Sequence, residues 1–190
     1  MTASHVALLR GINLAGKNRV AMADLRALVT DLGHTDVSTY IQSGNVLFTA
    51  VPGDTGAAAI GQAMSAALAA TLGVTSPVVV VSRDEMTQIV AANPFPDEPD
   101  PRRVHAVVLS EPPWPELAAR LDAAVTASAA KGARGDVKPA GRTLYLHTPD
   151  GYGNSDLAAT LMRIVSSPKA GLTGTARNWA TMTKLLAMCG

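Results

Sequence analysis

The sequence has a single cysteine, Cys189, and only four histidines, which are scattered along the chain. One cysteine excludes an internal disulfide and any metal site that needs several thiolates. None of the histidines has a second histidine or a glutamate at the spacing by which helices bind metals. We therefore expect no metal ion and no other cofactor.

Aromatic residues are also scarce, at 4% of the chain. RNA-recognition modules stack bases on aromatic side chains of their two central strands, and the strands expected here offer only Phe48. The 16 basic and 15 acidic residues give a net charge of +1, so the chain as a whole does not attract polyanions. These properties disfavour nucleic acid as a partner.

Long apolar runs are absent as well. No run approaches the length of a helix that spans a bilayer, and the N-terminus has no basic region before an apolar segment. The sequence therefore predicts a cytoplasmic protein that does not bind membranes.

Residues 1–92 have the patterns of one α+β module. Short β-rich runs are expected as strands at 5–9, 37–41, 46–49 and 78–81, and helices at 22–32 and from a cap at Asp54 to Leu72. The order β-α-β-β-α-β is that of a ferredoxin-like split βαβ module.

A proline-rich and acidic segment, residues 93–101, follows a short predicted helix and is interpreted as a linker. Residues 102–190 are expected to form a second α+β subdomain with the order β-α-β-β-α-α, in which a helix replaces the last strand. Its strand is expected at 104–109, its hairpin at 135–147, and its helices at 114–130, 154–166 and 176–188.

The expected topology brings two polar loops of the first module together. A split βαβ sheet has the antiparallel strand order four, one, three, two, so residues 10–13 and 42–45 should meet. The first loop continues through Lys17 to a helix with no Ser, Thr or Asp immediately before Met22 to cap it. The uncapped N–H groups of that helix favour an anion.

The same loop matches the phosphate-loop spacing G-x-x-x-x-G-K from Gly11 to Lys17, but Asn18 stands where the motif needs a hydroxyl. Phosphate-loop enzymes also use a parallel sheet, which this order of elements lacks. Three interpretations stay open. The loop has only a structural role, binds a small anionic or polar ligand, or is a nucleotide-hydrolysing phosphate loop.

The last predicted helix has Thr175 as its N-cap and carries Arg177 and Asn178. These two side chains have either a ligand role or a structural one. In the structural interpretation Arg177 pairs with an acid of the linker and Asn178 binds nearby backbone.

A glycine-rich turn at 151–156 leads into the preceding helix and offers Asn154 or Ser155 as its cap. Such a turn at a helix N-terminus can also hold an anion.

Five ordered motifs span the chain: Arg10-Gly-Ile-Asn13 with Gly16-Lys-Asn18; Met22-Ala-Asp-Leu-Arg26; Tyr40-Ile-Gln-Ser-Gly-Asn45; Asn93-Pro-Phe95; and Thr175-Ala-Arg-Asn-Trp179 with Thr181 and Lys184. In these motifs the sequence resembles the bacterial family called domain of unknown function 1697. The resemblance implies a cytosolic α+β protein with a ferredoxin-like N-terminal part, no established activity and no catalytic residues to transfer.

The chain departs from the family pattern at Ala180, where Asn is usual, and at Asp156, where Lys is usual. The second departure replaces a cation by an anion in the 151–156 turn. It therefore favours the loop from Arg10 to Lys17 as the anion site.

The favoured function is binding of a small anionic or polar ligand where loops 10–18 and 42–45 meet, near the Arg177 region. The candidate ligand-binding residues are Arg10, Asn13, Lys17, Asn18, Gln42, Ser43, Asn45, Arg177 and Asn178. One alternative is a non-catalytic interaction module, including a homodimer, and another is an enzyme that acts on a phosphorylated substrate. No catalytic residues can be named, because only Asp24 near this edge offers an acid or base.

Overall fold

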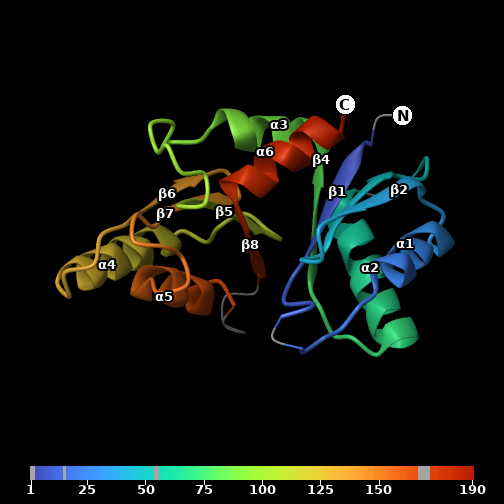
Figure 1. Cartoon of the computed structure of the whole chain (residues 1–190), viewed down its shortest axis with the longest axis horizontal. Coiled ribbons are helices and arrows are strands. Elements are labelled where there is room, and N and C mark those ends of the chain that lie inside the picture. Colours follow the sequence, from blue (N-terminus) through green and yellow to red (C-terminus); the bar gives the residue numbers. More distant parts are fainter. Residues whose placement is uncertain (1–2, 15, 54–55, 167–171) are drawn as a thin grey trace. The chain divides into compact units, whose positions relative to one another are not determined.

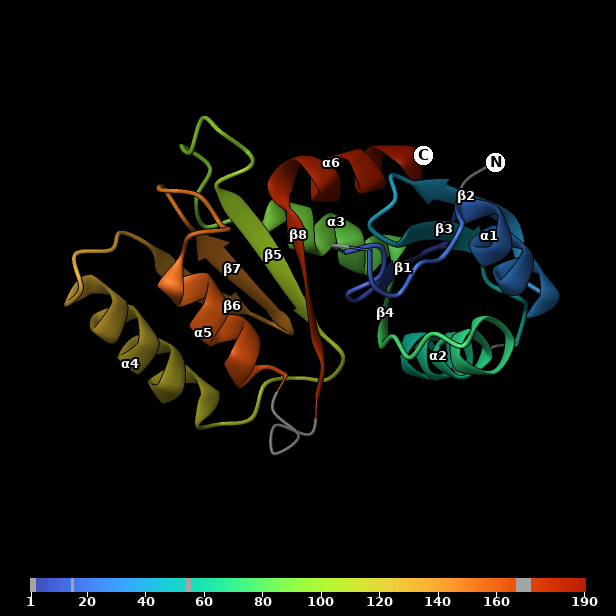
Figure 2. The same cartoon turned by 60° about the horizontal axis from the view of Figure 1, so that its bottom comes forward.

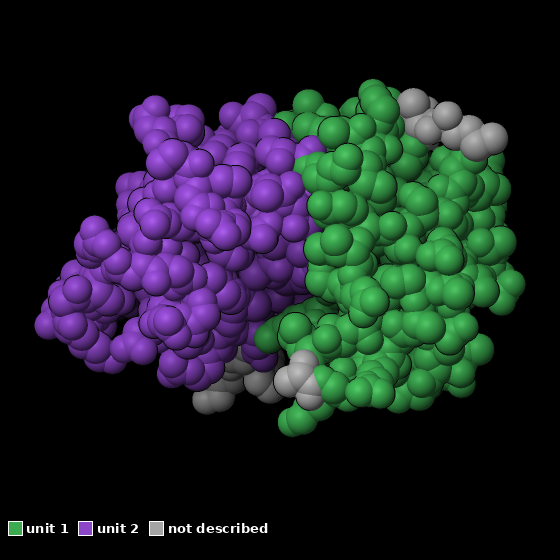
Figure 3. Space-filling model, in the orientation of Figure 1, with its two compact units in different colours: residues 1–88, 184–190 green, residues 89–183 purple. Residues whose placement is uncertain are grey.

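The computed structural model describes residues 3–14, 16–53, 56–166 and 172–190. The chain divides into two compact units, residues 1–88 with 184–190 and residues 89–183, which have different colours in Figure 3. The division falls within two helices, α3 (Arg83–Ala91) and α6 (Trp179–Met188).

The first unit has the predicted order of a ferredoxin-like module (Figure 1). Its elements are β1 (His5–Leu9), α1 (Met22–Asp31), β2 (Thr35–Tyr40), β3 (Asn45–Thr49), α2 (Ala57–Leu72) and β4 (Val78–Ser82). The sheet is antiparallel with the order β2-β3-β1-β4, which confirms the predicted strand order.

Helices α1 and α2 pack their apolar sides on one face of this sheet. The core includes Leu9 and Phe48 from the strands, Leu25 from α1, and Met64 and Leu68 from α2. Burying one such side chain stabilises the fold by about 1.5–3 kcal/mol relative to leaving it in water. This packing fixes the end of β1, from which the first polar loop departs.

The two helices of this unit differ in how their ends are capped. Helix α2 ends at Gly73, whose φ of 64° is typical of a glycine C-cap. The cap predicted at Asp54 lies outside the described residues. Helix α1 begins after Ala21, which makes no side-chain cap, as the sequence predicted. None of the described helices is both long and apolar enough to cross a membrane.

The second unit repeats the strand order of the first. Its elements are β5 (Val104–Leu109), α4 (Leu117–Ala129), β6 (Asp136–Ala140), β7 (Thr143–His147), α5 (Asp156–Ile164) and β8 (Gly174–Asn178). The antiparallel order is β6-β7-β5-β8, and α4 and α5 share a core with this sheet (Figure 2). The α+β fold class is confirmed, with two four-stranded antiparallel sheets.

One element of the second unit differs from the prediction. Residues 174–178 form strand β8, which pairs with β5 from His105 opposite Asn178 to Leu109 opposite Gly174. Thr175 therefore lies in a strand and is not the helix cap. The cap of α6 is Asn178, whose Oδ1 accepts a hydrogen bond from the Thr181 N–H at 2.8 Å. The strand was missed because its sequence, Gly-Thr-Ala-Arg-Asn, lacks the large apolar residues that mark strands.

Candidate functional site

The two polar loops of the first unit meet as predicted. The Leu9 N–H donates to the Gly44 carbonyl at 2.8 Å, and Asn13 Nδ2 donates to the Gln42 carbonyl at 3.0 Å. Gly44 permits this approach, because a Cβ there would lie 2.8 Å from Leu9 Cβ and 2.9 Å from Ile12 Cδ1. We call residues 10–14, 16–20 and 41–45 the basic loop edge.

Asparagine side chains hold the backbone of this edge. Asn13 accepts from the Val20 N–H at 2.9 Å and donates to the Val20 carbonyl at 3.0 Å, in addition to its bond with Gln42. Asn18 Nδ2 donates to the Gly11 carbonyl at 3.0 Å. Both asparagines have positive φ, 53° and 49°, a conformation that asparagine tolerates better than most residues. Their amide groups therefore stabilise the loop.

The hairpin between β2 and β3 is braced in a similar way. Asn45 is fully buried, and its Nδ2 donates to the Tyr40 carbonyl at 3.0 Å and to Ser43 Oγ at 3.1 Å. Gln42 is exposed and accepts from Asn13 through its backbone carbonyl. Of the predicted site residues here, Ser43 and Asn45 thus have structural contacts of their own.

The cationic side chains of this edge differ from the asparagines. Lys17 and Arg19 are exposed and Arg10 is half-buried, and no described carboxylate forms an ion pair with any of the three. The Arg10 backbone is held by Pro77 and Ser76, at 3.0 and 2.8 Å, so the position of that residue is fixed.

Two exposed apolar side chains accompany these cations. Leu14 is 62% exposed and Ile41 is 50% exposed, and each adjoins a residue of the Asn13–Gln42 hydrogen bond. Ile41 also has φ of 49°, a left-handed conformation that is strained for a β-branched residue. Neither this exposure nor this strain stabilises the fold.

Arg177 and Asn178, the other predicted site residues, lie in the second unit. Arg177 is buried on β8 and donates to Thr175 Oγ1 at 3.0 Å and to the Ala176 carbonyl at 2.8 Å. Burial lowers the pKa of Arg177 to about 10, and nearby Tyr152 opposes that shift. Asn178 caps α6, as described above.

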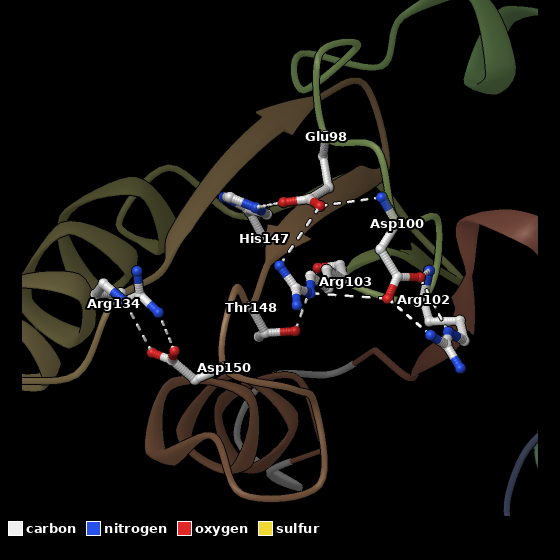
Figure 4. A network of polar contacts seen from close by, with 8 residues as sticks. All are labelled: Glu98, Asp100, Arg102, Arg103, Arg134, His147, Thr148 and Asp150. Atoms are coloured by element: carbon white, nitrogen blue, oxygen red, sulfur yellow. Dashed lines mark hydrogen bonds and ion pairs between the residues drawn. The ribbon is translucent and has the colours of Figure 1, made fainter.

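A network of acids and bases in the second unit was missed by the sequence analysis (Figure 4). His147 Nε2 lies 2.7 Å from Glu98 Oε2, and this hydrogen bond is the largest cause that lowers the pKa of Glu98. Arg102 binds Asp100 through two N–H groups, at 2.9 and 3.0 Å, and lowers the pKa of Asp100 to about 2. Three acids followed by two arginines within residues 97–103 were the available signal.

Further contacts extend this network on both sides. Arg134 forms an ion pair with Asp150, and Phe95 stacks on His147 with ring centroids 5.1 Å apart. The segment predicted as a linker therefore contacts β7 through Phe95 and Glu98. Glu98 and Asp100 bind His147, Arg102 and Arg103, so these two acids serve partners other than Arg177.

Comparisons with known proteins confirm the family resemblance. The model of the family described as "Protein of unknown function (DUF1697)" matches residues 1–145. The solved structure of the conserved bacterial protein SP0830 from Streptococcus pneumoniae is similar over 100% of both chains, with a TM-score of 0.68 and 21% identity. At that identity the likeness concerns the fold. No curated protein matches the chain.

Proposed function

The chain belongs to the DUF1697 family, and we propose that its first unit binds a small anionic or polar ligand at the basic loop edge. The observation that supports this proposal is a division of roles within the loops. Asparagine side chains bind loop backbone, whereas Lys17 and Arg19 are exposed and have no carboxylate partner among the described residues. The cations are thus available to a ligand on a braced backbone.

Helix α1 adds to the positive potential at this edge. Its first N–H groups follow Ala21, which supplies no side-chain acceptor, and they carry the partial positive charge of the helix N-terminus. Asp24 in the first turn offsets part of that charge. Cations near a helix N-terminus are unfavourable for folding, so Lys17 and Arg19 are better explained by a ligand than by stability.

The contributions of Arg177 and Asn178 stay predictions. Both have structural contacts within the second unit, as a buried strand residue and as a helix cap. The proposal therefore depends on Arg10, Lys17 and Arg19, which belong to one unit and one loop.

A second candidate function is supported by the exposed side chains of Leu14 and Ile41. Together with the cations they form a surface of mixed apolar and basic character, which also suits a protein partner or a second copy of the chain. The edge strand β6 is less suited to pairing, because it contains Lys138 and Pro139, residues that oppose strand addition.

Thermal unfolding with and without inorganic phosphate or sulfate tests the proposal. We expect the parent protein to be stabilised, by about 2.7 kcal/mol when the anion reaches roughly 100 times its Kd. Lys17→Ala and Arg19→Ala should lose this stabilisation while their stability without anion stays equal or rises slightly. Arg83→Ala, which removes an exposed arginine elsewhere in the same unit, is the matched control.

Two results would contradict the proposal. The first is a parent protein that neither anion stabilises. The second is a loss of stability in Lys17→Ala and Arg19→Ala without added anion, by about 1 kcal/mol or more, since that would give the cations a structural role. Dimerisation that depends on Leu14 and Ile41 would favour the second candidate.

A further inference from the structure

The second unit contains an open pocket of about 570 Å³ at the sheet edge where β5 begins and β7 ends. The register pairs Val104 with His147 and Asp136 with His147, which brings the beginnings of β5 and β6 to this edge. Its charged lining consists of Asp100, Arg102, Arg103, Arg134 and Asp150. We call this pocket the arginine pocket.

Arg103 differs from Arg102 and Arg134 because it forms two ion pairs but no side-chain hydrogen bond among the described residues. Its carbonyl accepts hydrogen bonds from Thr148 N–H at 2.8 Å and from Thr148 Oγ1 at 3.2 Å, so its backbone is fixed. Its guanidinium lies 3.7 Å from Asp100 and 3.9 Å from Glu98, which is too far for hydrogen bonds. Among the described residues its N–H groups have no hydrogen-bond acceptor, so a ligand that accepts from them would compete with two ion pairs and with no hydrogen bond.

His105, two residues further along, has an unsatisfied polar atom. It is only 8% exposed, and its Nδ1 is buried without a hydrogen-bond partner among the described residues. Buried polar atoms are bonded in the great majority of cases, because leaving one unpaired costs stability. An unpartnered histidine nitrogen is therefore a sign of a group that receives its partner from outside the chain.

Tyr152 connects His105 with the pocket. Its ring stacks on the His105 ring with centroids 4.2 Å apart, and it also lines the arginine pocket. Glycines lie on both sides of it, and Gly151 has φ of 97°. A Cβ at Gly151 or Gly153 would meet no atom within 4 Å, so there is space around this turn.

The end of the turn is fixed. Ser155 caps α5 by accepting from the Ala158 N–H at 3.1 Å, which is one of the two caps that the sequence predicted. A turn of the Tyr152 side chain leaves this cap in place, but it gives up the electrostatic interaction with Arg177.

We propose that the arginine pocket binds a small compound with a carboxylate or phosphate group, held by Arg103, and that Tyr152 turns aside so that His105 Nδ1 hydrogen-bonds the bound compound. The lining has three arginines and two aspartates, and the Glu98 carboxylate lies 3.9 Å from Arg103 beside it. The planar guanidinium matches two oxygens of a carboxylate or phosphate at once. An incoming anion can compete with Asp100 and Asp150 for Arg102 and Arg134, whose side chains are exposed.

Nuclear magnetic resonance of the His105 ring, in the full chain at pH 7, tests this site. Inorganic phosphate and acetate are the two probes, and they distinguish a phosphate site from a carboxylate site. We expect at least one probe to shift the His105 signals saturably, and His105→Gln assigns those signals among the four histidines. Arg103→Gln should weaken binding about tenfold, as the loss of a charged hydrogen bond does.

Four further variants test the role of Tyr152 and the location of the site. Tyr152→Ala should tighten binding about threefold or more, because the pocket no longer has to open. Tyr152→Phe keeps the covering ring and loses only the interactions of the hydroxyl, so its affinity should lie between those of the parent and Tyr152→Ala. Arg163→Ala, on α5 outside the pocket lining, and Lys17→Ala, on the basic loop edge, should leave the His105 response unchanged.

The site is refuted if neither probe shifts His105 saturably, or if the shift is equally strong in Arg103→Gln. Binding that is weakened by Tyr152→Ala would contradict the role of Tyr152 as a cover. A response that disappears in Lys17→Ala would assign the effect to the first unit and overturn the arginine pocket.

Discussion

The two units have the same strand order, but their polar side chains gather at opposite ends of the equivalent strands. In the first unit the basic loop edge lies where β1 ends and β3 begins. In the second unit the arginine pocket lies where β5 begins and β7 ends. The shared topology thus positions strand ends, and the loop sequences decide which end carries the charged side chains.

The loops that correspond in topology differ in composition. The loop after β1 is long and contains glycines and exposed cations, whereas residues 110–116 after β5 contain three prolines and two glutamates. The hairpin of the second unit does contain an arginine, Arg142, but it donates to the Leu109 carbonyl at 2.7 Å. In the second unit the cation at this end of the sheet therefore binds backbone. In the first unit the cations at the equivalent end form no ion pair with a described carboxylate.

The largest expected effect comes from the two hairpin glycines, Gly44 and Gly141. Gly44→Ala should destabilise the protein by about 3–4 kcal/mol, because the new Cβ combines positive φ with close contact to Leu9 and Ile12. Gly141→Ala should cost only about 1–2 kcal/mol, because its φ of 56° is unfavourable for alanine but a Cβ there meets no atom within 4 Å. Urea unfolding measures both, and equal losses would contradict the close contact at Gly44.

A second expected effect concerns His105 and acid. Burial lowers the pKa of His105 from 6.5 to about 4, so the unfolded chain binds a proton more readily in that range. The stabilisation is complete above pH 6.5 and is lost as pH falls to about 4, by about 3 kcal/mol. Urea unfolding at pH 7 and at pH 4.5 measures this loss of stability. His105→Phe should remove the part of the loss that comes from His105. The same decline in both proteins would contradict the burial argument.

A smaller effect is expected for the asparagines that brace the basic loop edge. Asn13→Ala removes three hydrogen bonds and should cost about 2 kcal/mol, whereas Asn18→Ala removes one side-chain bond and should cost about 1 kcal/mol. Asn13→Gly keeps the positive φ accessible and isolates the lost hydrogen bonds from backbone strain. Thermal or urea unfolding gives the ranking. An Asn13→Gly variant that is as stable as the parent protein would contradict the bracing role of Asn13.

The smallest effect is expected for Asp100, which is exposed to solvent screening. Its pKa is lowered from 3.8 to about 2, first by the hydrogen bond from Arg102. Its stabilisation is present above pH 3.8 and is lost as pH falls toward 2. Thermal melts in that range should show a weaker pH dependence in Asp100→Asn than in the parent protein. Superimposable curves would show that the pair is broken in solution.

The fold of the first unit could be predicted because its elements follow simple local rules. Periodic apolar residues marked α1 and α2, Gly73 marked a helix end, and the split βαβ order then predicted that the loops at Asn13 and Gln42 would meet. Strand β8 escaped prediction because its stability comes from pairing with β5, which a local pattern does not reveal.

The geometry of the candidate site could be predicted only in part, for a related reason. Sequence indicated which polar residues lie at the basic loop edge, but it left open whether each amide serves the backbone or a ligand. The hydrogen bonds of Asn13, Asn18 and Asn45 are specific to the folded loops. The arginine pocket was missed because Arg103, Arg134 and Asp150 are far apart in sequence and meet only through strand register.

The most direct test of the central claim is a phosphate titration of the full chain, followed through its backbone amide resonances. The account predicts saturable shifts for the amides of residues 16–24, which include the first turn of α1, and their loss in a Lys17→Ala and Arg19→Ala double variant. Amides of that turn that do not shift, or that shift equally in the double variant, would contradict a ligand site at the basic loop edge.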